Sequence, residues 1–157
     1  MPISFTKVKL PNGWLGNMAP YQVRYDGKEW RTTEALFQTL RFDDATVKEE
    51  IRAVKSPMGA KMRSKRDKGK MVIVPQSEED QANMSMVLRL KLDQHSELKQ
   101  QLLDTGDETI IEDCGKRTSR SSIFWGATLK DGQWVGENVL GSMWMTLRDE
   151  LVSQNRK

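Results

Sequence analysis

Residues 26–38 read DGKEWRTTEALFQ, and this order of residue types predicts a hairpin turn, a short strand and then a helix. The Asp26-Gly27 pair is typical of a two-residue hairpin turn, because such turns need positive φ, which glycine tolerates. Either Thr32 or Thr33 can cap the free N–H groups at the start of the helix. The stretch therefore predicts a strand-to-helix junction.

Glu34 lies in the first turn of this predicted helix, and Gln38 lies one turn later on the same face. An acid in the first turn of a helix commonly does no more than complement the helix dipole. Glu34 is also a candidate functional carboxylate, because other residues with possible chemical roles occur further along the chain.

The chain of 157 residues is long enough for one substantial core, so we expect a single domain over residues 1–157. Hydrophobic residues make up 37% of the chain and the mean hydropathy is −0.66, as in a soluble protein with a charged surface. No apolar run approaches the roughly 20 residues needed to span a bilayer. The first residues lack the apolar block of a signal peptide. We therefore expect a cytoplasmic protein without a membrane partner.

Cysteine and histidine occur once each, as Cys114 and His95. A single cysteine excludes an intramolecular disulfide and favours a reducing compartment. One cysteine and one histidine cannot form a zinc site of the usual kinds. We expect structural roles for both residues, no bound metal and no cofactor.

Helical patterns dominate the rest of the chain. The expected helices cover residues 33–42, 45–54 and 57–66, a long segment that starts after Ser77, a turn through Leu98 and Leu102, and an apolar stripe from Leu140 to Leu151. The expected strands cover residues 5–9, 21–25, 109–111 and 123–125. The predicted fold class is α+β, predominantly helical, with a few short strands.

Basic residues cluster between Lys61 and Lys70, where six cations stand against Asp67 alone. Such a run is either a solvated face or a contact for phosphate, because ammonium and guanidinium groups neutralise anionic oxygens. A third reading, nucleic-acid binding, has against it the 22 acidic residues and the lack of a recognisable motif.

Two further clusters follow later in the chain. Glu112 and Asp113 end a predicted strand, where acids either cap a neighbouring turn or project into a pocket. Trp125 precedes Gly126 in a glycine-flanked run, so it either stacks on a planar base or packs in the core.

Several short motifs follow one another over nearly the whole chain. They are GNMAP at 16–20, EW at 29–30, TEALFQ at 33–38, SPMGAK at 56–61, residues 84–91, LLDTG at 102–106, IED at 111–113, FWG at 124–126 and GENVLG at 136–141, ahead of Met145 and Arg148. In this order and spacing they resemble the NADAR family, also called YbiA-like proteins. The block at 33–38 is similar to the family's Ser-Glu-His-Tyr-Phe-Gln.

The resemblance implies a mostly helical α+β fold and hydrolysis of an N-glycosidic bond in NAD, ADP-ribose or related nucleotides. Glu34 matches the family's catalytic glutamate. A carboxylate suits this chemistry, because it can stabilise an oxocarbenium-like sugar and take a proton from water. Lys61 and Asp113 are the candidates for assisting the departing base. The expected substrate-binding residues are Asn17, Trp30, Gln38, Arg63, Trp125, Gly126 and Asn138.

Two departures from the family pattern concern substrate choice. Relatives often have a tryptophan in the stretch that matches residues 74–77, and many have an aspartate at the position of Ser122. Asp113 is a candidate for supplying the missing carboxylate.

We therefore expect an N-glycosidase, and the leading substrate is an ADP-ribosyl compound such as ADP-ribosylated guanine or an NAD-related nucleotide. The first alternative is a nucleotide-binding module that has lost activity. The second is a hydrolase of the ribosylamino pyrimidines of the riboflavin pathway. The expected partner is a nucleotide-like small molecule, with ADP-ribosylated nucleic acid as a further substrate form.

Overall fold

The computed structural model describes residues 1–156 and divides into two compact units. One unit consists of residues 17–95, and the other joins residues 1–16 to the segment that starts at Ser96. Each unit contains both helices and strands, and each is described by itself.

The unit of residues 17–95 begins with an antiparallel hairpin of β2 (Val23–Tyr25) and β3 (Lys28–Trp30). Asp26 and Gly27 form its turn with φ of 51° and 74°, as the Asp-Gly pair predicts. The helices that follow are α1 (Thr33–Thr39), α2 (Ala45–Ala53), α3 (Pro57–Arg66), the 3-10 helix η2 (Lys68–Lys70) and α4 (Glu78–Gln94).

Local capping explains where these helices begin. The Thr32 hydroxyl accepts the N–H of Ala35 at 3.1 Å at the start of α1. Asp44 caps α2, Ser56 caps α3 ahead of Pro57, and Ser77 caps α4. Of the two threonines predicted as caps, Thr32 is therefore the one that acts.

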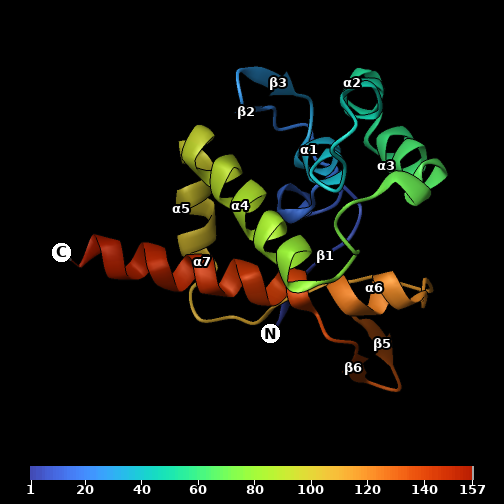
Figure 1. The fold of residues 1–157 in the computed structure, drawn as a ribbon. Helices are drawn as coiled ribbons and strands as arrows, with labels where there is room; N and C mark the ends of the chain where they lie inside the picture. Colours follow the sequence, from blue (N-terminus) through green and yellow to red (C-terminus); the bar gives the residue numbers. More distant parts are fainter. Residues whose placement is uncertain (157) are drawn as a thin grey trace. The chain divides into compact units, whose positions relative to one another are not determined.

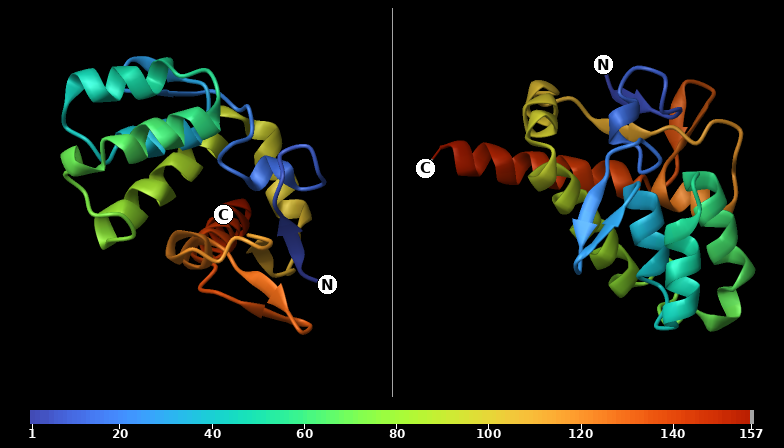
Figure 2. Two further views of the ribbon diagram at one scale, coloured as in Figure 1. Left: turned by 90° about the vertical axis from the view of Figure 1, so that its right-hand side faces the viewer. Right: turned by 90° about the horizontal axis from the view of Figure 1, so that it is seen from above.

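Helix α1 lies at the centre of this unit and packs against α2, α3 and α4. Figures 1 and 2 show α1, α2 and α3 side by side. All seven residues of α1 are buried, and Leu36 is fully inaccessible. Because α1 has no solvent face, its polar residues must find partners inside the unit.

The other unit contains a two-stranded parallel sheet of β1 (Ile3–Phe5) and β4 (Ile110–Glu112). Its remaining elements are η1 (Gly13–Leu15), α5 (Ser96–Asp104), α6 (Arg120–Trp125), the antiparallel hairpin of β5 (Thr128–Lys130) and β6 (Gln133–Val135), and α7 (Val139–Asn155). Helix α7 packs on β4, α5 and α6. Trp144 of α7 is fully buried and donates from Nε1 to the carbonyl of Leu15 at 3.0 Å.

The predicted strand at residues 123–125 is wrong, because this stretch is the second half of α6. Ser119 caps α6 by accepting the N–H of Ser122 at 3.2 Å. The apolar run of residues 123–125 suggests a strand and hides this helix start in the sequence. Helix α1 ends at Thr39, the first strand is residues 3–5 and the second is residues 23–25, so these predicted boundaries are also displaced. The predicted helical α+β class is confirmed.

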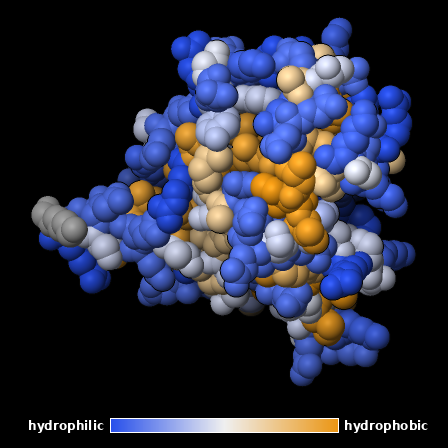
Figure 3. All heavy atoms as spheres, in the orientation of Figure 1, coloured by the Kyte–Doolittle hydropathy of each residue, from blue (hydrophilic) through white to orange (hydrophobic). Residues whose placement is uncertain are grey.

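Hydrophilic side chains cover most of the face in Figure 3, in keeping with a chain that is 30% charged. Among residues 1–156, none of the helices combines the length and the apolar character that crossing a bilayer requires.

Candidate active site

Glu34 lies in the first turn of α1, where the fold fixes both its backbone and its side chain. Its N–H donates to the carbonyl of Asn17 at 3.1 Å. Only 8% of its surface is exposed. The carboxylate is therefore held in a largely desolvated position, where its electrostatic interactions are stronger than in water.

Gln38 lies one turn after Glu34, as predicted, and its Nε2 donates to Glu34 Oε1 at 2.8 Å. Among residues 1–156, no group donates to the second carboxylate oxygen, Oε2, of Glu34. The predicted pair thus exists as a hydrogen-bonded unit with one carboxylate oxygen available.

Arg41 and Asp80 extend this pair, and neither residue is among those that the sequence pattern predicts for the site. Arg41 donates from Nε to Asp80 Oδ1 at 2.9 Å and from Nη2 to Asp80 Oδ2 at 2.8 Å. Its Nη1 lies 3.4 Å from Gln38 Oε1. Asp80 lies in the first turn of α4, and sequence spacing gives no signal for its contact with a residue 39 positions away.

Asn17 supports the start of α1. Its Oδ1 accepts the Thr33 hydroxyl at 2.7 Å, and its Nδ2 lies 3.1 Å from the sulfur of Met84. Its backbone carbonyl accepts the N–H of Glu34. Asn17 therefore positions Glu34, and its predicted contact with substrate stays a prediction.

Trp30 is buried at the end of β3 and packs as part of the core of its unit. Its Nε1 donates to the carbonyl of Tyr25 at 3.4 Å, which closes the hairpin. Its predicted role in substrate binding also stays a prediction.

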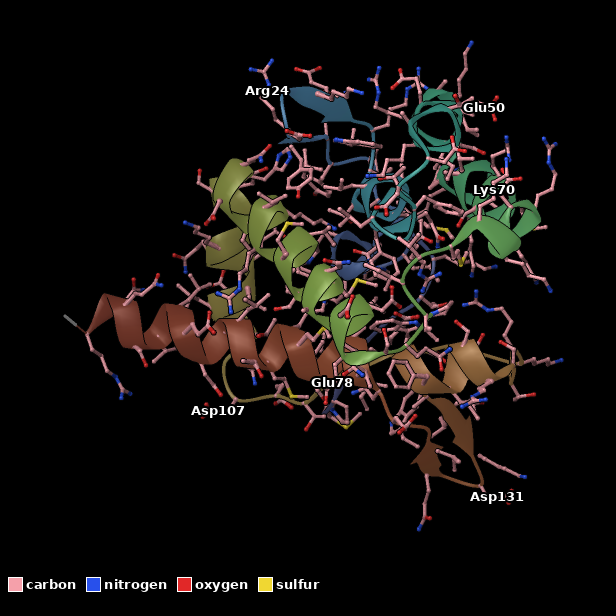
Figure 4. The ribbon with its side chains drawn as sticks, viewed as in Figure 1. Arg24, Glu50, Lys70, Glu78, Asp107 and Asp131 are labelled. Atoms are coloured by element: carbon pink, nitrogen blue, oxygen red, sulfur yellow. The ribbon has the colours of Figure 1, made fainter. Side chains whose placement is uncertain are left out.

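Lys61 and Arg63 lie on α3, which packs against α1. Arg63 forms ion pairs with Glu50 of α2, labelled in Figure 4, and with Asp67. Lys61 is half-buried and has no hydrogen-bond or ion-pair partner within residues 1–156. Of the two predicted cations, Lys61 is therefore the one available to an anionic ligand.

A shallow pocket of about 530 Å³ lies along α3 and the end of α2. It is lined by Val54, Gly59, Met62, Arg63, Lys65 and Arg66. Arg63 is the only predicted site residue in this lining. The pocket lacks a carboxylate, so its size does not make it the reaction centre.

The other four predicted residues belong to the unit that contains β4. Asp113 Oδ1 accepts the N–H of Gly115 at 2.8 Å, so this acid caps a turn at the end of β4. Its assistance to the departing base stays a prediction.

Asn138 is the residue before α7, where a side-chain cap for the helix would be expected, but its side chain makes no capping hydrogen bond. Instead Nδ2 donates to the carbonyl of Ile110 at 2.9 Å, and Oδ1 accepts the N–H of Glu112 at 3.0 Å. The side-chain amide thus makes the two hydrogen bonds to β4 that the backbone of a neighbouring strand would otherwise make. Its predicted contact with substrate stays a prediction.

Trp125 and Gly126 end α6. Trp125 is 8% exposed and packs edge-to-face on Phe124, with ring centroids 4.9 Å apart. A Cβ on Gly126 would lie 2.5 Å from the carbonyl of Glu112, so glycine is needed for close packing on β4. Both positions therefore have a packing role, and stacking on a base stays a prediction.

Lys91 is a buried titratable residue outside the set of predicted site residues. It lies on α4 with no exposed surface, and its Nζ lies 5.2 Å from the centre of the Tyr21 ring. Burial lowers the pKa of Lys91 to about 7, because desolvation disfavours the charged amine. Burial also raises the pKa of the Cys114 thiol, which makes it a poor nucleophile.

Comparison with known proteins gives a consistent assignment. The NADAR domain model matches residues 4–152. N-glycosidase YbiA of Escherichia coli K12 is 34% identical over 149 residues, which cover 95% of this chain and 88% of that protein. The NMR structure of E. coli YbiA has a TM-score of 0.80 at 31% identity and covers 100% of this chain and 90% of that chain.

A second relative has a different name. Riboflavin biosynthesis protein VVA0006 of Vibrio vulnificus YJ016 is 29% identical over 150 residues, which cover 96% of this chain but 38% of that protein. The predicted family resemblance is confirmed by the domain match and by YbiA. The predicted enzyme class, an N-glycosyl hydrolase, is confirmed with it.

Proposed function

Because this chain belongs to the NADAR family, we propose that it hydrolyses the N-glycosidic bond of an ADP-ribosyl compound, with Glu34 as the catalytic carboxylate. The observation that carries this proposal is the arrangement at Glu34. The carboxylate is largely buried, Gln38 holds one of its oxygens, and no group within residues 1–156 donates to the other.

The reaction needs a group that tolerates positive charge on the sugar. When the C–N bond breaks, its electron pair leaves with the base nitrogen and the ribosyl carbon becomes cationic. Glu34 Oε2 stabilises that cation and accepts a proton as water bonds to the carbon. The proton taken from water then passes, through solvent, to the base nitrogen, which leaves Glu34 ionised and completes the hydrolysis.

The distribution of charge favours a substrate with phosphates. Residues 55–70 contain seven cations and one acid, whereas the whole chain has a net charge of only +3. Apart from Arg63, these cations form no ion pair within residues 1–156. An ADP-ribosyl compound carries a diphosphate that Lys61 and its neighbours can bind.

A ribosylamino pyrimidine is the second candidate substrate. It is supported by the relative named as a riboflavin biosynthesis protein. The same carboxylate chemistry applies to it, but the diphosphate of an ADP-ribosyl compound makes fuller use of the seven cations of residues 55–70. A nucleotide-binding module without activity is the remaining alternative.

The proposal is tested by incubating the protein with ADP-ribosylated guanosine, NAD, ADP-ribose and a ribosylamino pyrimidine, and measuring the released nucleoside or base by mass spectrometry. We expect the release of guanosine from ADP-ribosylated guanosine to be the fastest of these reactions. Faster cleavage of the pyrimidine compound would identify the second candidate as the substrate. Binding of ADP-ribose without release of base from any compound would identify a binding module.

A further inference from the structure

We propose that Arg41, held by Asp80, is a positioning residue that orients the amide of Gln38 toward Glu34. The inference rests on the proposed function, because it gives Glu34 the catalytic role. It assigns a task in the reaction to two residues that do not touch the reacting atoms.

The four side chains form one continuous polar chain inside the unit of residues 17–95. Glu34 Oε1 accepts from Gln38 Nε2 at 2.8 Å, and Gln38 Oε1 lies 3.4 Å from Arg41 Nη1. Two further bonds of 2.9 and 2.8 Å fix Arg41 to Asp80. All four residues are at most 8% exposed, so water does not compete strongly with these contacts.

The direction of the Gln38 amide follows from the chemistry of arginine. A guanidinium group has donors and no acceptor, so only the oxygen of the amide can face it favourably. The NH₂ group must then face Glu34. Without Arg41, the amide could turn over and present its oxygen to the carboxylate, which would repel the ionised form and favour the protonated one.

Arg41 can perform this task because it is itself immobilised. Asp80 binds it through two parallel bonds, the geometry that fixes a guanidinium plane. Asp80 Oδ2 also accepts the N–H of Gln76 at 2.8 Å, which ties the carboxylate to the backbone before α4. The Arg41 guanidinium carbon lies 4.7 Å from the centre of the Phe37 ring, so the ring restricts its movement further.

The test compares variants of the full chain on the compound that the wild-type protein cleaves. Replacing Arg41 alone would leave Asp80 buried and unpaired, which is strongly destabilising. The main variant is therefore R41M/D80N, in which the new amide oxygen at position 80 can still accept the N–H of Gln76. Q38M removes the oriented amide, R41K is the conservative replacement, and R52M is the control for a more exposed arginine paired with Glu49.

We expect R41M/D80N to lower kcat about 10-fold or more, because small errors in orientation are costly, with KM nearly unchanged. R41K should recover part of that loss, and R52M should behave as wild type. In the Q38M background, R41M/D80N should cause no further loss, because Arg41 acts through Gln38. The acidic limb of the pH–rate profile should also move to higher pH in R41M/D80N.

Unchanged kcat in R41M/D80N, or an equal further loss in the Q38M background, would overturn the inference. If R41M/D80N does not fold, kcat of R41K is compared in the wild-type and Q38M backgrounds instead, and the same two outcomes would overturn the inference. The proposed function fails separately, and takes this inference with it, if E34Q retains the wild-type rate or the wild-type protein releases no base. A slow E34Q with a fully active R41M/D80N would leave the function intact and contradict only the positioning role.

Discussion

At the scale of single residues, some polar side chains of the predicted site bond to the protein scaffold, whereas others keep a group that a substrate could bind. Asn17, Asp113 and Asn138 bond to the backbone or to neighbouring side chains that shape the scaffold. Glu34 and Lys61 each keep a charged group without a full set of partners within residues 1–156. This difference separates groups that hold the fold from groups that remain available for substrate.

Asn138 provides a test of that distinction. Asn138→Asp would place an oxygen against the carbonyl of Ile110, where the amide now donates at 2.9 Å. We expect a loss of about 1 kcal/mol in the free energy of unfolding, the lower end of the cost of an unsatisfied group, because Asn138 is only partly buried. Urea denaturation measures it. Asn12→Asp is the matched control, because Asn12 has φ of 68° and no capping bond. Equal stability of both variants would contradict the bridging role of Asn138.

Trp125 provides a second test at this scale. Trp125→Ala should lower the free energy of unfolding by about 3–5 kcal/mol, because it removes a large buried ring. Trp134→Ala should cost much less, because Trp134 is only half-buried. Thermal denaturation compares the two. An unchanged melting temperature for Trp125→Ala would show that this ring does not support the core.

At the scale of elements, α1 presents the proposed catalytic carboxylate and α3 presents the cations. The sequence predicts both helices, because a threonine cap at position 32 or 33 and Pro57 are strong local start signals. Helix α6 escapes prediction, because its six residues are too few to show helical periodicity. Local signals thus predict α1 and α3, which carry the proposed site, better than a short helix such as α6.

The cations of α3 and η2 should not contribute equally. Lys61 is half-buried on α3, whereas Lys68 is exposed on η2. We expect Lys61→Ala to raise KM for an ADP-ribosyl substrate by about 10-fold, in line with a charge-assisted hydrogen bond to phosphate. Lys68→Ala should change KM by less than about twofold, because an exposed charge contributes little. Equal small effects from both variants would indicate a solvated face.

At the scale of the whole molecule, Lys91 makes stability depend on pH. Its pKa is about 7 in the folded protein and near 10.4 when unfolded. Between these values the unfolded chain binds more protons, so stability rises with pH, and the cost of burying Lys91 is greatest below pH 7. Lys91→Met removes this pH dependence.

Urea denaturation at pH 7 and pH 9 checks this prediction. The free energy of unfolding of the wild-type protein, measured relative to that of Lys91→Met, should rise between pH 7 and pH 9. The rise should be up to about 1.4 kcal/mol per pH unit. The same pH dependence in both proteins would show that Lys91 is charged, and compensated, throughout this range.

The candidate site can be predicted only in part, for a physical reason. Glu34 and Gln38 are one helical turn apart, so their contact follows from spacing alone. Arg41 and Asp80 are 39 residues apart, and their contact exists only because α1 packs against α4. Contacts set by tertiary packing leave no periodic signal in a single sequence.

Glu34→Gln tests whether the Glu34 carboxylate carries the reaction. The variant keeps the size of the side chain and removes its charge. We expect the rate of guanosine release from ADP-ribosylated guanosine, followed by mass spectrometry, to fall roughly 100-fold or more, with the melting temperature unchanged. Near-normal turnover by Glu34→Gln would show that another group carries the reaction.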